Sequence, residues 1–384
     1  MTLVPYRYRL YPNKEQREYF AKVFGCVRFV YNKMLEDSEK YYELCGERLR
    51  TNPSSYKDEY PFLREVDSSA LSNAKINLDH AYNRFFNRTA ERPKFKSRKD
   101  GRCSYSTCMY RNNIRIEGSY IRLPKIKLVK MRIHRPFTGA IRKVTVVKTP
   151  SGEYYATILS DTEVQKLPDV DKKIGIDMGI LNYVTGSDGT VVENIRSYNM
   201  YMRKLARENR RYSRKQKGGK NREKQRIKLA KVYKKITNVR SDYLHKLSRR
   251  IVDENQVIAC ENLDVGALMN ANPKANRDIM DSSWSAFISM LEYKSQWYGR
   301  KFVKVGTFYP SSQICSSCGY KNSEIKGILV RNWVCPKCGA SHQRDVNAGK
   351  NILKEGERLL ALSDASGDIY TKSKGTTYID VVVY

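Results

Sequence analysis

Three acidic residues, far apart along the chain, stand in settings that would let their carboxylates meet. Asp177 and Glu261 each end a short apolar run of strand type, and turn-forming residues follow each of them. Asp345 opens a segment that we expect to be helical from Asp345 to Leu353. Carboxylates from two strand ends and one helix can converge on Mg²⁺, which prefers oxygen ligands. Any one of these acids is equally well explained as a solvated turn residue, but the three together favour a site.

The chemistry that such a site would support is hydrolysis of a phosphodiester. Two Mg²⁺ ions about 4 Å apart, or Mn²⁺ in their place, can activate a water and stabilise the leaving oxygen. We expect Asp177 to bridge both ions, with Glu261 on one ion and Asp345 on the other. Arg344 is expected to steady the scissile phosphate, and a structural salt bridge is an equal alternative for it.

A second metal site is predicted from the cysteine spacing. Cys315-x-x-Cys318 and Cys335-x-x-Cys338 are separated by 16 residues, and each pair can direct two thiolates at one tetrahedral Zn²⁺. Four thiolates complete a structural zinc site, so we expect His342 to lie by the acids rather than to bind zinc. The alternative is two pairs of reduced thiols.

The charge of the chain points to an acidic partner. The 384 residues include 72 Lys and Arg against 40 Asp and Glu, which gives a net charge of +32. Nucleic acid is the first expectation and an acidic membrane surface the second. No apolar run reaches the ~18 residues that span a bilayer, and Arg7, Arg9 and Lys14 interrupt any signal-peptide core. We therefore expect a cytoplasmic, nucleoid-associated prokaryotic protein with no membrane segment.

Basic residues are most concentrated between Tyr201 and Arg250, where 20 Lys and Arg face three acidic residues. Gly218-Gly219 is expected to divide this stretch into two long helices. A solvated helix normally mixes charge signs to form i,i+4 pairs, so the imbalance favours contact with a nucleic-acid backbone. The candidate backbone contacts are Arg210, Arg211, Arg214 and Lys215.

The N-terminal half is predicted to combine two helices with a run of short strands. A strand is expected at Tyr6–Tyr11, a helix after the capping pair Asn13 and Gln16, and a second helix from about Ser68 to Arg88. The run of strands suggests a small antiparallel barrel or sandwich, to which the first strand could add. Its predicted members are Asn113–Glu117, Tyr120–Leu123, Met131–His134, Lys143–Lys148 and Tyr154–Ser160.

The C-terminal half is predicted to alternate strands with helices. A hairpin is expected from Lys172 to Val192 with Ser187-Asp188-Gly189 as its turn. A short buried strand follows at Val257–Cys260. A helix is expected around Trp284 to Trp297, and another strand at Phe302–Val305.

Together, these motifs resemble those of the TnpB family. Its members are transposon-encoded, RNA-guided nucleases related to type V CRISPR effectors. The resemblance runs from Tyr6 to Ile352, with the three acids at the positions of the RuvC-type triad. The chain departs from the family at Gln343, where an acid is common, and at Gly349, where alanine is usual. The segments that carry the resemblance are Arg9-Leu10-Tyr11-Pro12-Asn13, Gly25-Cys26-Val27-Arg28-Phe29-Val30-Tyr31-Asn32, Pro93-Lys94-Phe95-Lys96, Tyr309-Pro310-Ser311-Ser312-Gln313 and Arg331-x-Trp333-x-Cys335.

The resemblance implies an α/β multidomain fold. Its parts would be an RNase H-like (RuvC) nuclease core, a β-barrel wedge domain, a small inserted helical recognition domain and a zinc-ribbon insertion. The implied domains are the first wedge strand (1–11), the recognition domain (12–100), the wedge barrel (101–168), the RuvC-like core (169–308, with the basic helical insertion at about 199–250), the target-nucleic-acid-binding zinc ribbon (309–340), the third RuvC motif helix (341–358) and a disordered tail (359–384).

The resemblance also implies an activity, that of an RNA-guided DNA endonuclease acting as a monomer with one guide RNA. The guide would derive from the transposon end, and one site would cut both strands of a double-stranded target beside a short motif. We assign motif reading to short polar side chains that can approach base edges, with helix capping and a solvated face as equal alternatives. These residues are Ser68, Ser72, Asn73 and Thr107.

Two other functions stay open at this point. One is a compact type V CRISPR effector, which differs in its genomic neighbourhood, a repeat array in place of a transposon end, rather than in its chemistry. The other is an RNA-guided DNA-binding repressor or transposition accessory that does not cut. A protein that only binds has no need of three converging acids, so their presence favours cleavage.

Overall fold

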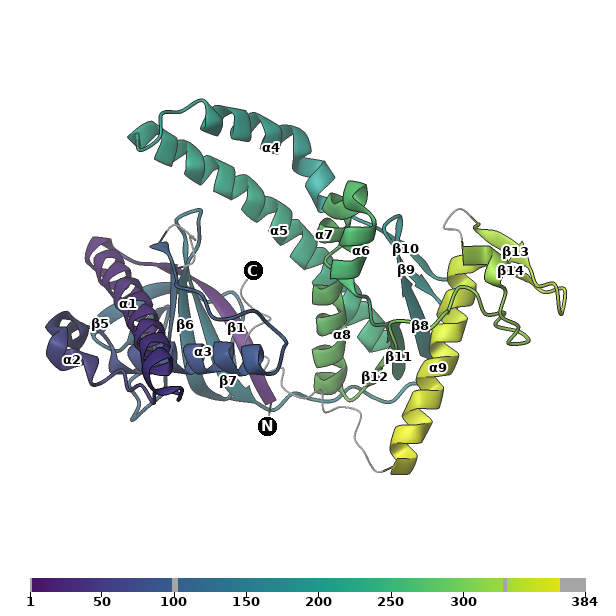
Figure 1. Ribbon diagram of the computed structural model, residues 1–384, viewed down its shortest axis with the longest axis horizontal. Coiled ribbons are helices and arrows are strands. Elements are labelled where there is room, and N and C mark those ends of the chain that lie inside the picture. The colour runs from purple at the N-terminus through teal and green to yellow at the C-terminus, as the bar shows by residue number, and fades with distance from the viewer. Residues whose placement is uncertain (1, 99–102, 327–329, 367–384) are drawn as a thin grey trace. The chain divides into compact units, whose positions relative to one another are not determined.

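The computed structural model describes residues 2–98, 103–326 and 330–366. The chain divides into two compact units, Met1–Glu163 and Val164–Tyr384, and Figure 1 colours them from purple at the N-terminus to yellow at the end of the second unit. Each unit encloses a hydrophobic core of its own. None of the helices within these described ranges is long and apolar enough to cross a membrane.

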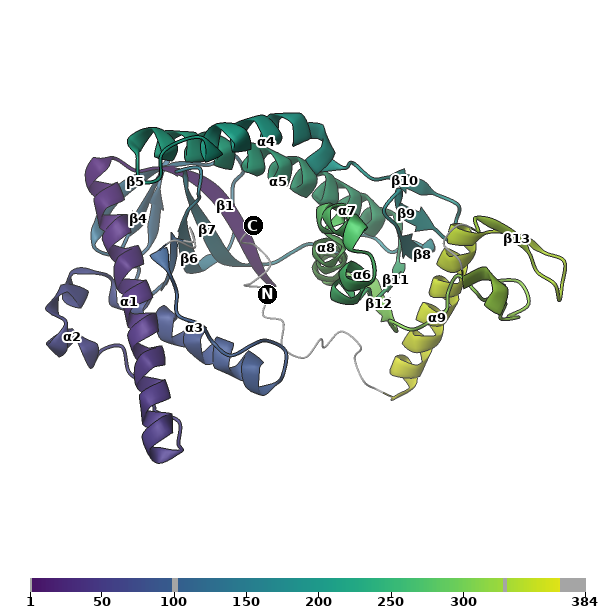
Figure 2. The same ribbon diagram turned by 45° about the horizontal axis from the view of Figure 1, so that its top comes forward.

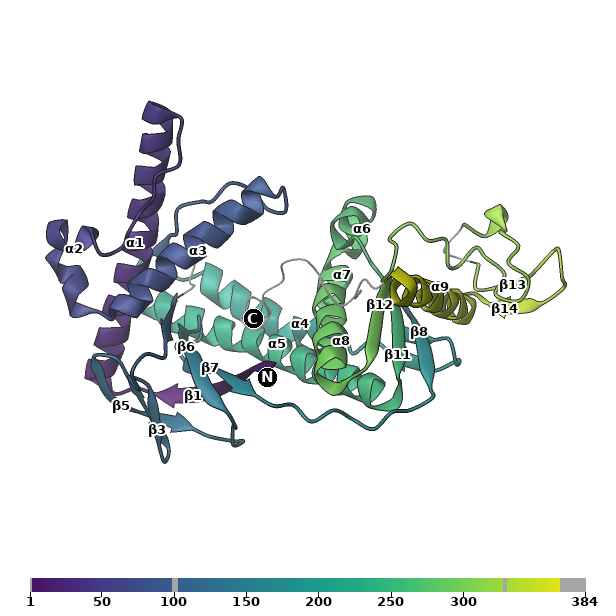
Figure 3. The same cartoon turned by 90° about the horizontal axis from the view of Figure 1, so that it is seen from below.

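The first unit pairs a curled antiparallel sheet with helices. Its seven strands run in the order β2-β6-β7-β1-β5-β4-β3, and Figure 3 shows helices α1 and α3 on one side of this sheet, with α1 extending away from it. The elements are β1 (Thr2–Tyr11), α1 (Lys14–Cys45), α2 (Tyr56–Glu59), a 3-10 turn (Pro61–Glu65), α3 (Ser68–Phe86), β2 (Cys103–Cys108), β3 (Arg115–Glu117), β4 (Tyr120–Leu123), β5 (Ile126–Arg132), β6 (Ala140–Lys148) and β7 (Tyr154–Thr162).

Helix α1 begins where the sequence predicts. The Asn13 side chain accepts a hydrogen bond from the Gln16 main chain, and the Gln16 side chain accepts one from the Asn13 main chain, which forms a complete capping box. The helix ends at Gly46, whose φ of 70° suits glycine. Its buried face, from Phe20 to Leu35, belongs to the core of this unit, where the Phe20 ring packs against Tyr105 of β2 and Tyr154 of β7.

The structure corrects two predictions for this unit. The sheet is curled but open, because no pairing joins its edge strands β2 and β3 among the described residues, so the barrel does not close. The strand predicted at Met131–His134 is β5, which instead spans Ile126–Arg132. It lies earlier because Lys130 pairs with Tyr11 of β1 on one side and with Tyr120 of β4 on the other.

The second unit is built on a five-stranded sheet in the order β10-β9-β8-β11-β12. Strands β8, β11 and β12 are parallel, and β9 runs antiparallel to both of its neighbours. The elements are β8 (Lys173–Met178), β9 (Asn182–Gly186), β10 (Val191–Glu193), α4 (Ser197–Ser213), α5 (Lys220–Glu254), β11 (Val257–Glu261), α6 (Val265–Ala271), a 3-10 turn (Pro273–Ala275), α7 (Asn276–Ser282), α8 (Trp284–Tyr298), β12 (Lys301–Val305), a 3-10 turn (Ser323–Lys326), β13 (Asn332–Val334), β14 (Ser341–Gln343) and α9 (Arg344–Ser366).

Helices cover both faces of this sheet. Ile258 and Cys260 of β11 join a core with α5, α7 and α8, whereas Ala259 between them faces a second cluster with Ile352 of α9. This alternation follows from the period of two in a strand. Figures 1 and 2 accordingly show α8 and α9 on opposite sides of β8 and β11. Helices α4 and α5 form a long antiparallel hairpin, and the break predicted at Gly218-Gly219 is confirmed.

Two predictions for this unit are wrong in detail. The segment from Lys172 to Val192 holds three strands instead of a hairpin, and Ser187-Asp188-Gly189 turns between β9 and β10. Helix α9 does not stop near Leu353 but continues to Ser366, because its apolar face stays in contact with the sheet. The predicted tail therefore starts too early, and its residues 367–384 lie outside the described part of the chain.

Candidate active site

Two of the three acids lie side by side at one edge of the parallel sheet. Ile176 of β8 pairs with Cys260 of β11 in parallel register, so Asp177 and Glu261, the next residue of each strand, lie beside each other. Side chains at matched positions of neighbouring strands point to the same face. The sheet register therefore brings together two carboxylates that are 84 residues apart in the sequence.

Helix α9 brings the third acid to the same edge, and two glycines allow it to come close. A Cβ atom on Gly175 of β8 would lie 2.0 Å from the Gly349 carbonyl oxygen, and one on Gly349 would lie 2.9 Å from the Ser187 nitrogen. Neither position has room for a side chain. Asp345 lies one helical turn before Gly349. The close packing of α9 on β8 at this glycine therefore places the Asp345 carboxylate near Asp177.

The first turn of α9 is capped by Gln343. Its Oε1 accepts a hydrogen bond of 2.6 Å from the Val346 nitrogen, which satisfies one of the free N–H groups at the helix start. The glutamine at this position therefore has a structural role in fixing the helix that carries Asp345.

The electrostatics of the site reflect a cluster of carboxylates with too little positive charge. Burial, followed by the negative charges of Glu261 and Asp345, raises the pKa of Asp177 to about 8, and the Arg344 guanidinium opposes this rise. Burial also raises the pKa of Glu261, against a hydrogen bond from Ser311. A cation placed among these groups would offset their repulsion and favour the ionised forms.

Two arginines border the acids. The Arg331 guanidinium lies 3.3 Å from Asp345 Oδ2, and the Arg331 carbonyl accepts a hydrogen bond from the Arg344 main chain. The Arg344 side chain reaches Ser312 Oγ at 3.5 Å, and its charge acts on Asp177. In the sequence, Arg331 stands out only as part of the motif Arg331-x-Trp333-x-Cys335, which does not predict its contact with Asp345.

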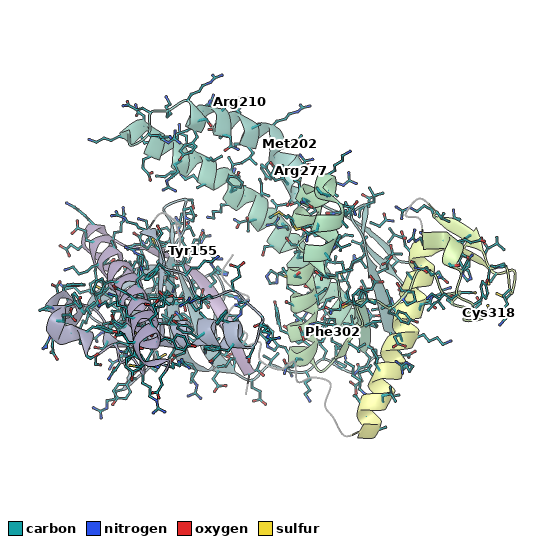
Figure 4. All side chains as sticks on the ribbon, viewed as in Figure 1. Tyr155, Met202, Arg210, Arg277, Phe302 and Cys318 are labelled. Atoms are coloured by element: carbon teal, nitrogen blue, oxygen red, sulfur yellow. The ribbon has the colours of Figure 1, made fainter. Side chains whose placement is uncertain are left out.

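The four cysteines of the paired motifs form a compact cluster. Their Sγ atoms all lie within 4.8 Å of one another, with 3.7 Å between Cys315 and Cys338 and between Cys318 and Cys335. A tetrahedron with Zn–S bonds of about 2.3 Å has edges of about 3.8 Å. The cluster could therefore hold one zinc ion, and Figure 4 marks Cys318 in it.

His342 belongs to this cluster and not to the acids, contrary to the prediction. Its Nε2 lies 3.0 Å from Cys315 Sγ, and its ring packs against Trp333 with centroids 4.7 Å apart. Within the described residues, no other set of three or more Cys, His, Asp and Glu ligand atoms is as closely grouped as the cysteines. The interaction of the three acids is instead seen in the effect of Glu261 and Asp345 on the pKa of Asp177.

The predicted backbone contacts lie at the far end of the hairpin of α4 and α5. Arg210, Arg211, Arg214 and Lys215 are all exposed, and Figure 4 marks Arg210 on the side of α4 that faces away from α5. Arg211 lies 3.2 Å from Glu208, a buried acid that also accepts a 2.6 Å hydrogen bond from Gln225 of α5. That pair ties the two helices together near their tip.

The four residues assigned to motif reading divide into two kinds. Ser68 and Ser72 are exposed on the first turns of α3, and the helix is capped by Asp67 rather than by either serine. Asn73 and Thr107 are buried, at 4% and 0% exposure. Asn73 donates to the Ser69 carbonyl, so in this conformation only the two serines can meet a partner.

Polar residues around the acids were missed by sequence reasoning. Ser311 donates a hydrogen bond to Glu261, and Asn347 and Asn351 of α9 bind the segment that carries Ser311. The only available signal was the i,i+4 spacing of two asparagines on the apolar face of a helix. That pattern does not reveal which segment they contact.

Comparisons with known proteins agree with this architecture. Family models match at residues 1–47 (a helix-turn-helix domain), 151–272 (a family described as probable transposase) and 284–352 (the TNB domain of Cas12f1-like proteins). A protein of Streptomyces pristinaespiralis, named as a candidate RNA-guided DNA endonuclease, is 37% identical over 94% of this chain and 90% of its own length.

Two further relatives extend the comparison. InsQ of Escherichia coli K12, named in the same way, is 29% identical over 94% of both chains. The CRISPR-associated endodeoxyribonuclease Cas12f1 of Sulfoacidibacillus thermotolerans is 28% identical over 52% of this chain and 50% of its own. A Cas12f1 structure solved with its guide RNA and target DNA has the same fold at a TM-score of 0.57, with 15% identity over 88% of this chain and 83% of that one.

Proposed function

Because the chain belongs to the TnpB family, we propose that it is an RNA-guided DNA endonuclease of a transposable element. The observation that carries this proposal is the meeting of Asp177, Glu261 and Asp345 at one edge of the parallel sheet, where burial and mutual repulsion raise the pKa of Asp177 to about 8. Such an arrangement is costly for folding and is typical of a catalytic site.

We assign the second unit to an RNase H-like core. Three parallel strands with an antiparallel β9 on one side, and helices on both faces, support that assignment. The first unit is assigned to the wedge and recognition domains, and residues 309–340 to the zinc ribbon. These parts follow one another along the chain in the domain order that the family resemblance implies.

Divalent cations fit the acidic site, because the pKa values of Asp177 and Glu261 stay raised despite the neighbouring arginines, and a cation among the carboxylates would offset their repulsion. Asp177, Glu261 and Asp345 would hold Mg²⁺, which when bound activates water for attack on phosphorus and stabilises the leaving oxygen. The protein's own residues supply orientation. Ser311 holds Glu261, and Arg344 is placed to contact a phosphate oxygen near Asp177.

Binding of nucleic acid is assigned to surfaces separate from the acids. The exposed cations of the hairpin of α4 and α5 would contact phosphates of the guide RNA or target DNA, and base pairing with the guide would select the sequence. Loss of a catalytic acid should therefore remove cleavage without removing binding.

The experiment that tests the function is plasmid cleavage with a matched guide RNA, run beside a binding assay on the same preparation. Asp177→Ala should reduce cleavage of both strands by at least about 10³-fold, since phosphoryl transfer depends on positioning and charge neutralisation. Guide-dependent DNA binding should stay within about twofold, and removing Mg²⁺ with a chelator should reproduce the loss. Cleavage that survives in Asp177→Ala would place the active site elsewhere.

Reading of the motif beside the target is proposed for Ser68 and Ser72. Both residues are exposed and lie one helical turn apart on α3. Ser68 Oγ accepts a hydrogen bond from Lys57, and Ser72 Oγ donates one to the Ser68 carbonyl. Exchanging these bonds for bonds to DNA would let both hydroxyls reach base edges in a groove. Replacing both with alanine should alter the preferred motif in a randomised-target cleavage assay. An unchanged preference would remove them from this role, and Asn73 or Thr107 would then need a different conformation to take part.

The alternative of a compact CRISPR effector is favoured by one observation, the match to Cas12f1 over half of the chain. Sequencing the small RNA that co-purifies with the protein separates the two functions. RNA that ends in the transposon's own terminus supports the proposal, whereas RNA with a repeat from a CRISPR array supports the alternative.

A further inference from the structure

A short connector joins the last strand of the sheet to the first cysteine pair, and it touches one of the acids. The Ser311 hydroxyl donates a hydrogen bond of 2.6 Å to Oε1 of Glu261. Ser311 is only 5% exposed, so water does not readily take the place of this hydroxyl. The bond occupies one oxygen of the carboxylate and thereby fixes the direction in which Glu261 points.

Helix α9 holds the connector in place through a buried amide. Asn351 Nδ2 donates to the Ser311 carbonyl at 2.8 Å and to the Ile314 carbonyl at 2.6 Å. Asn351 is 2% exposed. A buried amide that lost these partners would be left with unsatisfied donors, so the helix and the connector are held in one arrangement.

A second buried amide, one turn earlier on α9, forms hydrogen bonds with the connector next to the first cysteine pair. Asn347 donates to the Ile314 carbonyl at 2.7 Å and accepts from the Ser316 nitrogen at 2.9 Å, directly after Cys315. The same helix carries Asp345 in its first turn. One element thus carries an acid, holds the serine that binds a second acid, and anchors the cysteine cluster.

We infer that Ser311 and Asn351 are positioning residues for Glu261: Asn351 holds the main chain of the connector, and the Ser311 hydroxyl orients the carboxylate toward Asp177 and Asp345. The inference rests on the proposed function, because its consequence is tighter cation binding by the three acids. Groups that orient a metal-binding side chain typically contribute 10–100-fold in affinity.

A purely structural role makes a different prediction. If Asn351 only satisfied two carbonyls, its loss would lower stability and the fraction of folded protein. The molecules that remained folded would still bind a cation as the unaltered chain does. The half-saturating cation concentration, rather than the amount of activity, therefore separates the two roles.

The experiment titrates Mn²⁺ into the full-length, zinc-loaded protein by electron paramagnetic resonance, with Asp177→Ala giving the background from other sites. Ser311→Ala and Asn351→Ala should each raise the half-saturating Mn²⁺ concentration about tenfold. Ser317→Ala is the matched control, because this exposed serine lies in the same region of the chain, and it should change the value less than twofold. Zinc content and melting temperature report whether each variant is folded.

The same variants are then compared in plasmid cleavage across a range of Mg²⁺ concentrations. The inference predicts that cleavage by Ser311→Ala is restored at high Mg²⁺. Unchanged Mn²⁺ affinity in folded Ser311→Ala would overturn it, as would equal Mn²⁺ binding by the unaltered chain and Asp177→Ala. If the unaltered chain binds Mn²⁺ at the acids but cuts no guided target, the proposed function fails while the Mn²⁺ comparison still decides the role of Ser311.

Discussion

Lys294 in the second unit is a buried lysine without a carboxylate among its hydrogen-bond acceptors in the described part of the chain. The Lys294 ammonium is 7% exposed and has two neutral acceptors, the His245 carbonyl and the Ser248 hydroxyl, each at 2.7 Å. Burial, followed by the nearby Arg249 charge, lowers the pKa of Lys294 to about 8 from an ordinary value of 10.5. The folded state therefore releases this proton at a lower pH than the unfolded chain does.

This difference predicts a stability that depends on pH. Between about pH 8 and 10.5 the unfolded chain binds more protons at Lys294 than the folded chain, so this residue's contribution to the free energy of unfolding rises with pH. Relative to Lys294→Met, the unaltered chain should gain up to about 3 kcal/mol across this window, because each pKa unit between about 8 and 10.5 corresponds to about 1.4 kcal/mol.

Urea unfolding at a series of pH values measures this gain. Lys274→Met, at an exposed position of the same unit, serves as the control and should show a constant difference from the unaltered chain. A difference for Lys294→Met that does not change between pH 8 and 10.5 would mean that Lys294 remains charged in the folded protein.

At the scale of elements, the start of α4 depends on one acid from another helix. Asp281 of α7 accepts hydrogen bonds from the Ser197 hydroxyl at 2.6 Å and from the Tyr198 nitrogen at 2.9 Å. Arg240 of α5 lies 3.2 Å from the same carboxylate. Asp281 thus caps α4 and ties both helices of the hairpin to the body of the unit.

Asp281→Ala should lower the free energy of unfolding by about 2–4 kcal/mol, because it leaves buried donors and an arginine without their partner. Hydrogen exchange should rise first in the opening turn of α4. Asp278→Ala, an exposed acid of the same helix, should change stability by less than about 1 kcal/mol. Equal effects from the two substitutions would show that Asp281 is no more than a surface residue.

The exposed end of the hairpin supports a prediction about nucleic-acid binding. Each phosphate contact contributes about 0.9 to the slope of log affinity against log salt concentration. Exchanging four cations for glutamine should therefore make the slope for guide-free DNA binding shallower by up to about 3–4. The residues to exchange are Arg210, Arg211, Arg214 and Lys215.

The control for this measurement uses two cations near the opposite end of α5, away from the tip of the hairpin, each paired with an acid one turn away on its own helix. Lys246 lies 2.8 Å from Asp242, and Arg249 lies 2.7 Å from Asp253. Exchanging these two for glutamine should leave the slope nearly unchanged. A slope that stays constant in the fourfold variant would identify the end of the hairpin as an ordinary solvated surface.

At the scale of the whole molecule, the cysteine cluster should control the integrity of the second unit. Cys335→Ser should reduce zinc content from about one ion per chain to well below one and should lower the melting temperature, because zinc binding contributes to folding free energy. Zinc is measured by atomic absorption. Cys45→Ser, an exposed cysteine of the first unit, should keep both values, and a well-folded unaltered chain without zinc would contradict the assignment.

The sequence by itself determined the features that depend on local pattern. The capping pair Asn13 and Gln16 starts α1 as predicted, and the break at Gly218-Gly219 separates α4 from α5. The spacing of the cysteine pairs also predicted a cluster of suitable size. Each of these signals lies within a few neighbouring residues or in a repeated short motif, so no distant contact is needed to read it.

Tertiary structure alone decided which distant groups meet. Asp177 and Glu261 are neighbours because of strand register, and Asp345 joins them because Gly175 and Gly349 let α9 approach β8. In the first unit, packing of α3 against β2 buried Asn73, which sequence reasoning had placed on a binding surface. A side chain's partner is fixed by long-range packing of helices on a sheet, and composition and periodicity carry no information about that register.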